Sequence, residues 1–246
     1  VALFGAGPAR SDPRSPFSDD AIRSSAGIAA FTEVPPPASR VHTGFRYDTV
    51  HVAEGITTFI EAPSHAMVQG NITLIAGSKA ALVIDSGHYP AVALRVIADM
   101  RKLTSKPVRY LAITHWHMDH YMANSQFADE FPGLTIIAQN FTAPMMDKYG
   151  GRYVNYGAKI EDNLKPLREM LASGKAPDGA PIAPDRRARI EKAIGEVEAA
   201  KPEFALMRYR GADLTFENEI DVDLGNRMVR LMHLGRGNTA GDLFAY

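Results

Sequence analysis

The stretch Thr114-His115-Trp116-His117-Met118-Asp119-His120 is the most distinctive part of this sequence, with three histidines and an aspartate close together. Three of the chain's 8 histidines fall between positions 115 and 120. Imidazole nitrogens and carboxylates are donors for zinc and other transition ions. In an extended segment, residues two apart point to the same side, so His115 and His117 are expected to converge. Asp119 keeps that parity, and His120 follows on the turn. The pattern predicts a metal site, because without a cation the cluster would carry an electrostatic and desolvation cost.

The segments around this stretch predict an α/β protein. A buried-type strand over residues 108–114 leads into it, and a helix over 90–103 has apolar residues at helical spacing. Upstream, β-rich runs separated by turn signals predict an antiparallel meander over 47–52, 56–60, 71–76 and 80–85. Downstream, a short helix over 124–131 precedes a strand over 134–138. This order of strands and helices indicates a layered α/β architecture.

A helical block follows, with helices expected over 140–148, 160–171 and 184–200. Either a lid or solvated packing over the sheet would explain it, and packing over the sheet is favoured. Strands are then expected over 214–216, 220–224, 228–234 and 242–246.

Residues 1–40 differ in composition from the rest and are rich in Pro, Ala and Ser. Such a segment predicts a flexible N-terminal arm. The apolar start Val1-Ala2-Leu3-Phe4 followed by small residues fits the tail of a secretory signal as well as an ordinary arm. A periplasmic or secreted protein is therefore expected, with a cytoplasmic one as the alternative.

Composition excludes several classes of function. The 246 residues carry 27 Lys and Arg against 28 Asp and Glu, and no basic stripe with interleaved aromatic residues suggests nucleic-acid binding. With 0 cysteines, disulfides, thiolate metal sites and thiol nucleophiles are excluded. No apolar run reaches the roughly 18 residues that cross a bilayer. Neither a Gly-x-Ser-x-Gly elbow nor a phosphate-binding glycine loop is present. A small-molecule substrate is expected, and the oligomeric state stays open.

The motif His115-x-His117-x-Asp119-His120 resembles the metal-binding motif of the metallo-β-lactamase superfamily. Its context is similar too, because Val83-Ile84-Asp85-Ser86-Gly87 and a helix precede the strand that enters it. The resemblance covers about residues 47–246. It implies an αββα sandwich, two sheets flanked by helices, as a domain over 41–246 with a helical insertion at about 140–205.

The resemblance also implies roles for individual residues. His115 and His117 resemble ligands of a first metal position, and Asp119 and His120 resemble ligands of a second. Asp119 would also be catalytic by orienting the water, and a metal-held hydroxide would attack an ester, lactam, thioester or similar bond. Asp85 resembles a carboxylate that supports the metal loop from behind its ligands, or it simply begins a turn.

The chain departs from the family pattern at Asn238, where the family has a histidine ligand of the first position. An amide oxygen is a poorer zinc ligand than imidazole, so the position could bind weakly, use a water or take a harder ion. Asn238 could equally serve only the turn. His233 is expected behind the ligands or in the core. One or two zinc ions are the expected cofactor, with iron or manganese as alternatives.

Three classes of function follow from these observations. A zinc-dependent hydrolase of unidentified substrate is the leading hypothesis, followed by an iron-dependent redox relative. The third is a non-catalytic binding module that lost a metal ligand at Asn238. The family's last ligands normally lie beyond the block that contains Asn238. The second half of the fold is therefore expected to be incomplete in this chain, or the site to be completed by another chain.

Overall fold

The computed structural model describes residues 46–61 and 69–246, so the expected arm over residues 1–40 lies outside the described part. A seven-stranded sheet has the strand order β1-β2-β3-β4-β5-β6-β7. Its first four strands are antiparallel: β1 (Tyr47–Ala53), β2 (Ile56–Glu61), β3 (Ile72–Ala76) and β4 (Ala81–Ile84). The remaining strands run parallel to β4: β5 (Val108–Ile113), β6 (Thr135–Gln139) and β7 (Leu214–Phe216).

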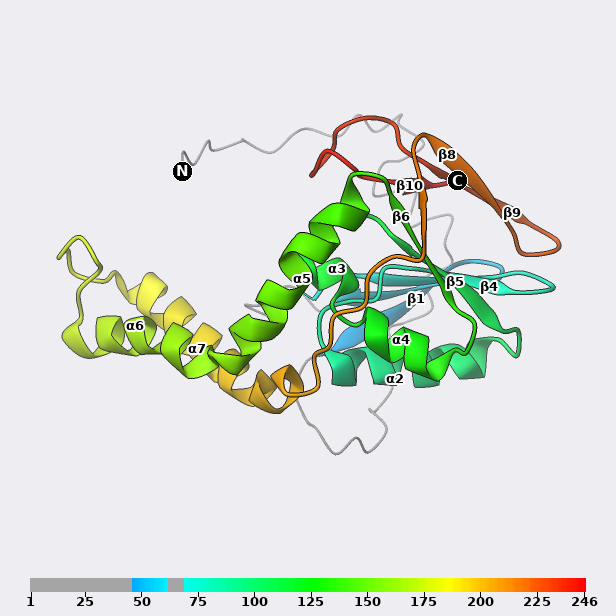
Figure 1. Cartoon of the computed structure of the whole chain (residues 1–246). Coiled ribbons are helices and arrows are strands. Elements are labelled where there is room, and N and C mark those ends of the chain that lie inside the picture. Colours follow the sequence, from blue (N-terminus) through cyan, green and yellow to red (C-terminus); the bar gives the residue numbers. More distant parts are fainter. Residues whose placement is uncertain (1–45, 62–68) are drawn as a thin grey trace, which may run out of the picture.

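A second, three-stranded sheet packs on one face of the first. It is antiparallel, in the order β10-β9-β8, from β8 (Glu219–Asp223), β9 (Met228–Met232) and β10 (Phe244–Ala245). Helices α2 (Pro90–Leu103) and α4 (Asn124–Glu130) cover the opposite face (Figure 1). The described chain therefore has a helical layer and two sheets, which confirms the predicted α/β class.

Strand β5 shows how the sequence specifies these layers. Its residues Leu111 and Ile113 point into the core between sheet and helices, whereas Ala112 points into the core between the two sheets. Successive side chains of a strand point to opposite faces, and this strand is apolar on both. The continuous apolar run before the histidine motif thus fixes β5 in the middle of the molecule.

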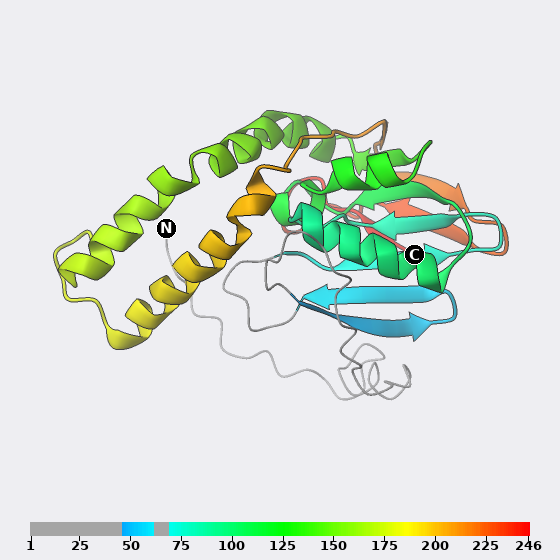
Figure 2. The same ribbon diagram turned by 90° about the horizontal axis from the view of Figure 1, so that it is seen from below.

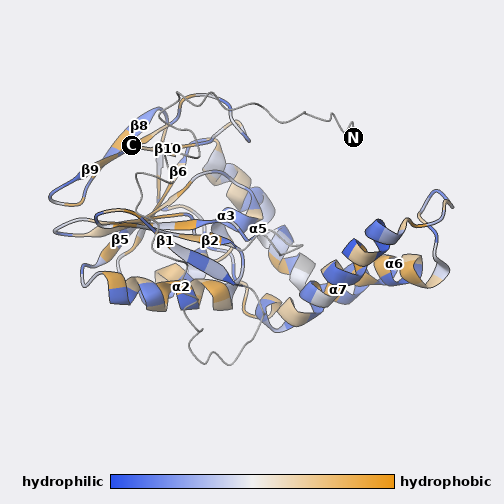
Figure 3. Cartoon of the chain, turned by 180° about the vertical axis from the view of Figure 1, so that it is seen from behind, coloured by the Kyte–Doolittle hydropathy of each residue, from blue (hydrophilic) through white to orange (hydrophobic). Residues whose placement is uncertain are grey.

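Helix α2 forms because its sequence supplies both a start and one apolar face. Pro90 stands in the first turn, where its missing N–H costs nothing. Val96, Ile97 and Met100 are each 1% exposed and lie on the sheet. Bands of opposite hydropathy alternate along the helix, as expected for one buried and one solvated face (Figure 3).

The helical block differs from the expectation. Helices α6 (Ile160–Ser173) and α7 (Pro184–Phe204) pack against one another and project beyond the edge of the sheet (Figure 2), so packing over the sheet is wrong for this hairpin. Helix α5 (Thr142–Ala158) also continues past the expected end at residue 148. It continues through Gly150, where a Cβ would lie 2.0 Å from the ring of Tyr209, so this glycine permits close packing and does not end the helix. Of the helices in the described part of the chain, none combines the length and apolar character that a bilayer crossing needs.

Candidate metal centre

The histidine motif lies at the carboxyl edge of the parallel strands. Asp85 follows β4, and the motif follows β5, whose Ala112 pairs in parallel register with Ile84. Because the carboxyl ends of parallel strands meet at one edge of a sheet, the two segments come together there. The turn of the motif is a short helix, α3 (Met118–Tyr121), that the sequence did not predict.

Asp85 lies under the motif and is almost fully buried. Its carboxylate accepts hydrogen bonds from the Thr114 backbone N–H at 2.7 Å and the Thr114 hydroxyl at 2.8 Å. The Nδ1–H of His120 donates to the same carboxylate at 2.6 Å. Asp85 has a φ of 59°, in the left-handed region that only glycine adopts freely. Three hydrogen bonds to one side chain over-determine this conformation.

His115, His117 and Asn238 converge on one point. Nε2 of His115 lies 3.2 Å from Nδ1 of His117. The side-chain amide of Asn238 lies 3.0 Å from the first nitrogen and 3.3 Å from the second. Ligands of a tetrahedral zinc ion, about 2.0–2.1 Å from the metal, are themselves about 3.3 Å apart. The three groups therefore have the mutual spacing of a metal-ligand set.

The hydrogen bonds of His115 select the tautomer that a metal needs. The Thr114 hydroxyl donates to Asp85 and so accepts from Nδ1 of His115, at 3.1 Å. The lone pair of His115 then lies on Nε2, which faces His117 and Asn238. Burial lowers the pKa of His115, and the neighbouring His120 ring lowers it further. His115 is thus held neutral, in the form that binds a cation.

Asp119 and His120 form a second pair beside the first set. Nε2 of His120 lies 3.2 Å from Oδ2 of Asp119. Burial disfavours the charged His120 ring, but the hydrogen bonds that it donates to Asp119 and Asp85 outweigh this effect and raise its pKa to about 10. Burial likewise opposes charge on Asp119, yet His120 lowers the pKa of this carboxyl. A cation bound between them would replace the proton on His120, as metal sites generally do.

The loop that carries Asn238 is held by Asp242, for which no role was predicted. The Asp242 carboxylate accepts from the backbone N–H of Asn238 at 2.6 Å and that of Thr239 at 2.8 Å. The Thr239 hydroxyl also donates to it, at 2.6 Å. The signal was present in the sequence, because a threonine three residues before a carboxylate resembles a helix capping box.

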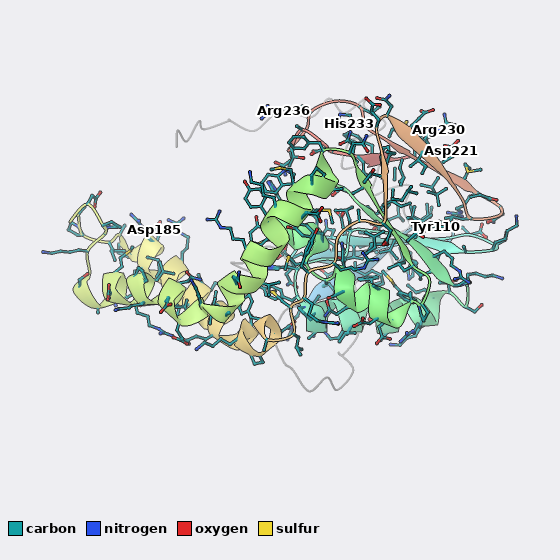
Figure 4. All side chains as sticks on the ribbon, viewed as in Figure 1. Tyr110, Asp185, Asp221, Arg230, His233 and Arg236 are labelled. Carbon is teal, nitrogen blue, oxygen red and sulfur yellow. The ribbon has the colours of Figure 1, made fainter. Side chains whose placement is uncertain are left out.

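His233 does not join the converging set. It lies just after β9 (Figure 4), and its Nδ1 donates to the backbone carbonyl of Asp242 at 2.8 Å. It therefore contacts the loop of Asn238 from behind the converging set.

Within the described residues, no three His, Asp or Glu side chains are placed to hold one metal ion together. The substitution at Asn238 accounts for this, since an amide occupies the third place beside His115 and His117. Nitrogen and oxygen of an amide exchange places when the group rotates by half a turn, and which one faces the histidines is an assignment. With its oxygen turned inward, Asn238 supplies the missing donor, so the residues present fit a cation.

Comparison with known proteins gives the family of the chain. A sequence model described as the metallo-beta-lactamase superfamily matches residues 66–243. The chain belongs to the metallo-β-lactamase superfamily. Members of this superfamily usually bind divalent metal ions, which agrees with the donor set described above.

Solved metallo-β-lactamases match the chain at low sequence identity. One from Pontibacter korlensis is 13% identical with a TM-score of 0.49, over 82% of this chain and 66% of its own. The DIM-1 metallo-beta-lactamase gives the same identity and TM-score over 82% and 64%. FEZ-1 from Legionella gormanii is 14% identical with a TM-score of 0.47, over 89% and 59%. The chain thus spans somewhat less than two thirds of the length of each. Among curated proteins, none matches the chain.

Proposed function

We propose that this member of the metallo-β-lactamase superfamily is a zinc-dependent hydrolase of a small-molecule ester, lactam, thioester or similar bond. The observation that carries the proposal is the convergence of His115, His117 and Asn238 within 3.0–3.3 Å of one another. Three donors at this spacing beside a buried carboxylate network are the arrangement that catalytic metal sites use.

Each donor has a place in the proposed centre. His115, His117 and the Asn238 amide oxygen would hold the first metal ion, and Asp119 with His120 would hold a second. Two imidazoles favour zinc over magnesium or calcium, which prefer oxygen donors. A bound zinc ion supplies a water with a pKa near 7 and polarises the bond to be cleaved.

Asp119 is the proposed catalytic residue of this chain. Its carboxylate is partly exposed and lies on the turn between His117 and His120. With its pKa lowered by His120, it stays ionised at neutral pH and can accept a hydrogen bond from the attacking water. Asp85 and Thr114 do no chemistry themselves, but they fix the rings of His115 and His120 from behind.

A panel of reporter substrates tests the proposal. A chromogenic β-lactam, a p-nitrophenyl ester, a thioester and a p-nitrophenyl phosphate diester should be offered to the zinc-loaded protein. We expect hydrolysis of at least one, abolished by a chelator and restored by zinc. Asp119→Asn should lower the rate of that reaction about 100-fold or more, since it removes a proton acceptor.

The control removes a carboxylate far from the proposed metal ligands. Asp129→Asn changes an exposed carboxylate that pairs with Arg208, and it should leave the rate unchanged. Hydrolysis that survives chelation and Asp119→Asn would contradict the proposal. Restoration by iron but not by zinc, with a visible chromophore, would favour the redox alternative instead.

A further inference from the structure

Trp116 connects the proposed metal ligands to helix α5. Its ring stacks on the ring of Tyr149, with centroids 4.9 Å apart and planes inclined by 16°. The same indole meets the ring of His117 edge to face, at 4.9 Å and 79°. The three rings form a continuous row from α5 to one of the two converging histidines.

Helix α5 contacts the rest of the site as well. Tyr153, one turn beyond Tyr149, stacks on it at 6.3 Å and approaches Tyr121 of α3 at 6.5 Å. At the start of the helix, the buried Thr142 hydroxyl donates to the Gly241 carbonyl at 2.7 Å, in the loop that carries Asn238. One helix therefore contacts the histidine segment, the turn after it and the loop of the third donor.

The position of α5 is fixed by close packing behind it. The ring of Tyr209 lies against Gly150, where a Cβ would come within 2.0 Å, and it also meets the Tyr121 ring at 6.3 Å. The Tyr209 hydroxyl donates to the Asp147 carboxylate of the same helix. Because Tyr209 holds α5 in place on one side, the helix can fix the ring of Trp116 on its other side.

Ring orientation matters at His117 because the nitrogen that faces the converging point is Nδ1, next to the point of attachment. A rotation of the imidazole about its bond to Cβ would move Nδ1 away from His115 and Asn238. The asparagine at position 238 makes metal binding depend more strongly on the orientation of His117. A weaker third donor leaves more of the binding to the two imidazoles.

We propose that Tyr149 is a positioning residue that orients His117 through the ring of Trp116. The inference rests on the proposed function, because His117 must bind the metal for its orientation to matter. Tyr149 itself touches no reacting atom. Its role is that of the outer partners of metal ligands, whose loss typically weakens metal binding about 10- to 100-fold.

The alternative is that Tyr149 merely fills space, and two substitutions distinguish the cases. Tyr149→Phe keeps a flat ring that can stack on Trp116, whereas Tyr149→Leu keeps an apolar side chain without a flat ring. If only apolar burial matters, the two variants should bind metal alike. If stacking orients Trp116, only the leucine variant should be impaired.

Trp116 is the chain's only tryptophan, so its fluorescence reports on the proposed metal loop directly. Zinc should be titrated into the full metal-free chain against a competing chelator, with fluorescence and bound zinc both measured. We expect Tyr149→Leu to weaken zinc binding about tenfold, and Tyr149→Phe to stay within about twofold of the wild type. The visible spectrum of the cobalt-loaded protein should change in Tyr149→Leu and not in Tyr149→Phe.

The outcomes separate this inference from the proposed function. A wild type that binds zinc, with Tyr149→Leu binding equally well and giving an unchanged cobalt spectrum, overturns the inference alone. Equal losses in both variants also overturn it, since the hydroxyl would then matter and the stack would not. A wild type that binds neither zinc nor cobalt overturns the proposed function and the inference together. If Tyr149→Leu fails to fold, Tyr149→Met is the second variant and the same comparison holds.

Discussion

The carboxylate of Asp85 lies 2.6 Å from Nδ1 of His120, which joins the end of β4 to the turn after β5. The same carboxylate binds the backbone and hydroxyl of Thr114, and the Thr114 hydroxyl in turn contacts His115. One buried side chain thus orients residues of both proposed metal positions. Asp85 therefore supports the whole motif although it has no chemical role of its own.

Replacing Asp85 by Asn should show how much this support contributes. Asparagine has the same shape and tolerates a left-handed backbone, but it carries no charge and has only one acceptor oxygen. We expect zinc affinity to fall about 10- to 100-fold in a chelator competition assay. The matched control is Asp221→Asn, which changes an exposed carboxylate that pairs with Arg230 on the three-stranded sheet (Figure 4). It should bind zinc with wild-type affinity. Equal affinities of wild type and Asp85→Asn would show that Asp85 only shapes a turn.

Gly70 packs directly against the turn of the motif. It has a φ of 71°, and a Cβ there would lie 2.3 Å from the Asp119 carbonyl oxygen. Gly70→Ala should therefore destabilise the fold by about 2 kcal/mol and weaken zinc binding by displacing Asp119.

Gly179→Ala isolates the backbone part of this effect. Gly179 has a similar φ of 84° but open space around its Cβ position, so its loss of unfolding free energy should be near 1 kcal/mol. Urea unfolding of the two variants measures the difference, and an equal loss would mean that the contact with Asp119 is not tight.

Asn238 invites the reverse experiment. Asn238→His restores an imidazole beside His115 and His117, and an imidazole is a stronger zinc ligand than an amide oxygen. We expect zinc affinity to rise about tenfold or more. Asn226→His adds a histidine in an exposed turn between β8 and β9, away from His115 and His117. It should leave the zinc affinity unchanged. An unchanged zinc titration in Asn238→His would mean that position 238 serves the turn alone.

Glu203 makes the stability of the chain depend on pH. Its buried carboxylate, near the end of α7, accepts a hydrogen bond from the Ala91 N–H in the first turn of α2 at 2.7 Å. Burial raises its pKa from 4.5 to about 7, although the Ala91 bond and Arg95 oppose the shift. The folded chain therefore keeps a proton that the unfolded chain releases above about pH 4.5.

The contribution of Glu203 to the free energy of unfolding should accordingly be largest below pH 4.5 and fall as the pH rises to 7, with no further loss from this group above it. The loss at Glu203 is at most about 3 kcal/mol, since each pKa unit corresponds to about 1.4 kcal/mol. Glu203→Gln cannot ionise and should flatten this part of the profile, measured by urea unfolding between pH 5 and 8. A variant with the same slope as the wild type would show that Glu203 is already ionised at pH 5.

The order of elements was predictable because apolar periodicity and turn residues specify it locally. The apolar run before Thr114 specified β5, and the close spacing of His115 and His117 specified the convergence that the structure has. Asp85 could be placed near the motif only from the resemblance to the metallo-β-lactamase superfamily, since the parallel pairing of β4 with β5 was not predicted. Local pattern was sufficient wherever neighbours in sequence are also neighbours in space.

Features set by distant contacts were not predictable. The helix expected over residues 140–148 continues to Ala158 in α5, and Tyr209, far along the chain, packs against Gly150 within it. The projection of the α6–α7 hairpin depends on how α5 leaves the sheet, which no local pattern encodes. The amide of Asn238 was visible in the sequence, but its 3.0 Å approach to His115 depends on the Asp242 loop.

The number of zinc ions bound by each chain is the sharpest test of the proposed metal centre. Metal-free protein should be loaded with excess zinc, dialysed and subjected to elemental analysis, beside the double variant His115→Ala/His117→Ala. We expect at least about one zinc ion for each wild-type chain and a clear loss in the double variant, whose far-ultraviolet circular dichroism should be unchanged. A wild type that retains no zinc, or a double variant that retains as much as the wild type, would contradict the proposed metal centre.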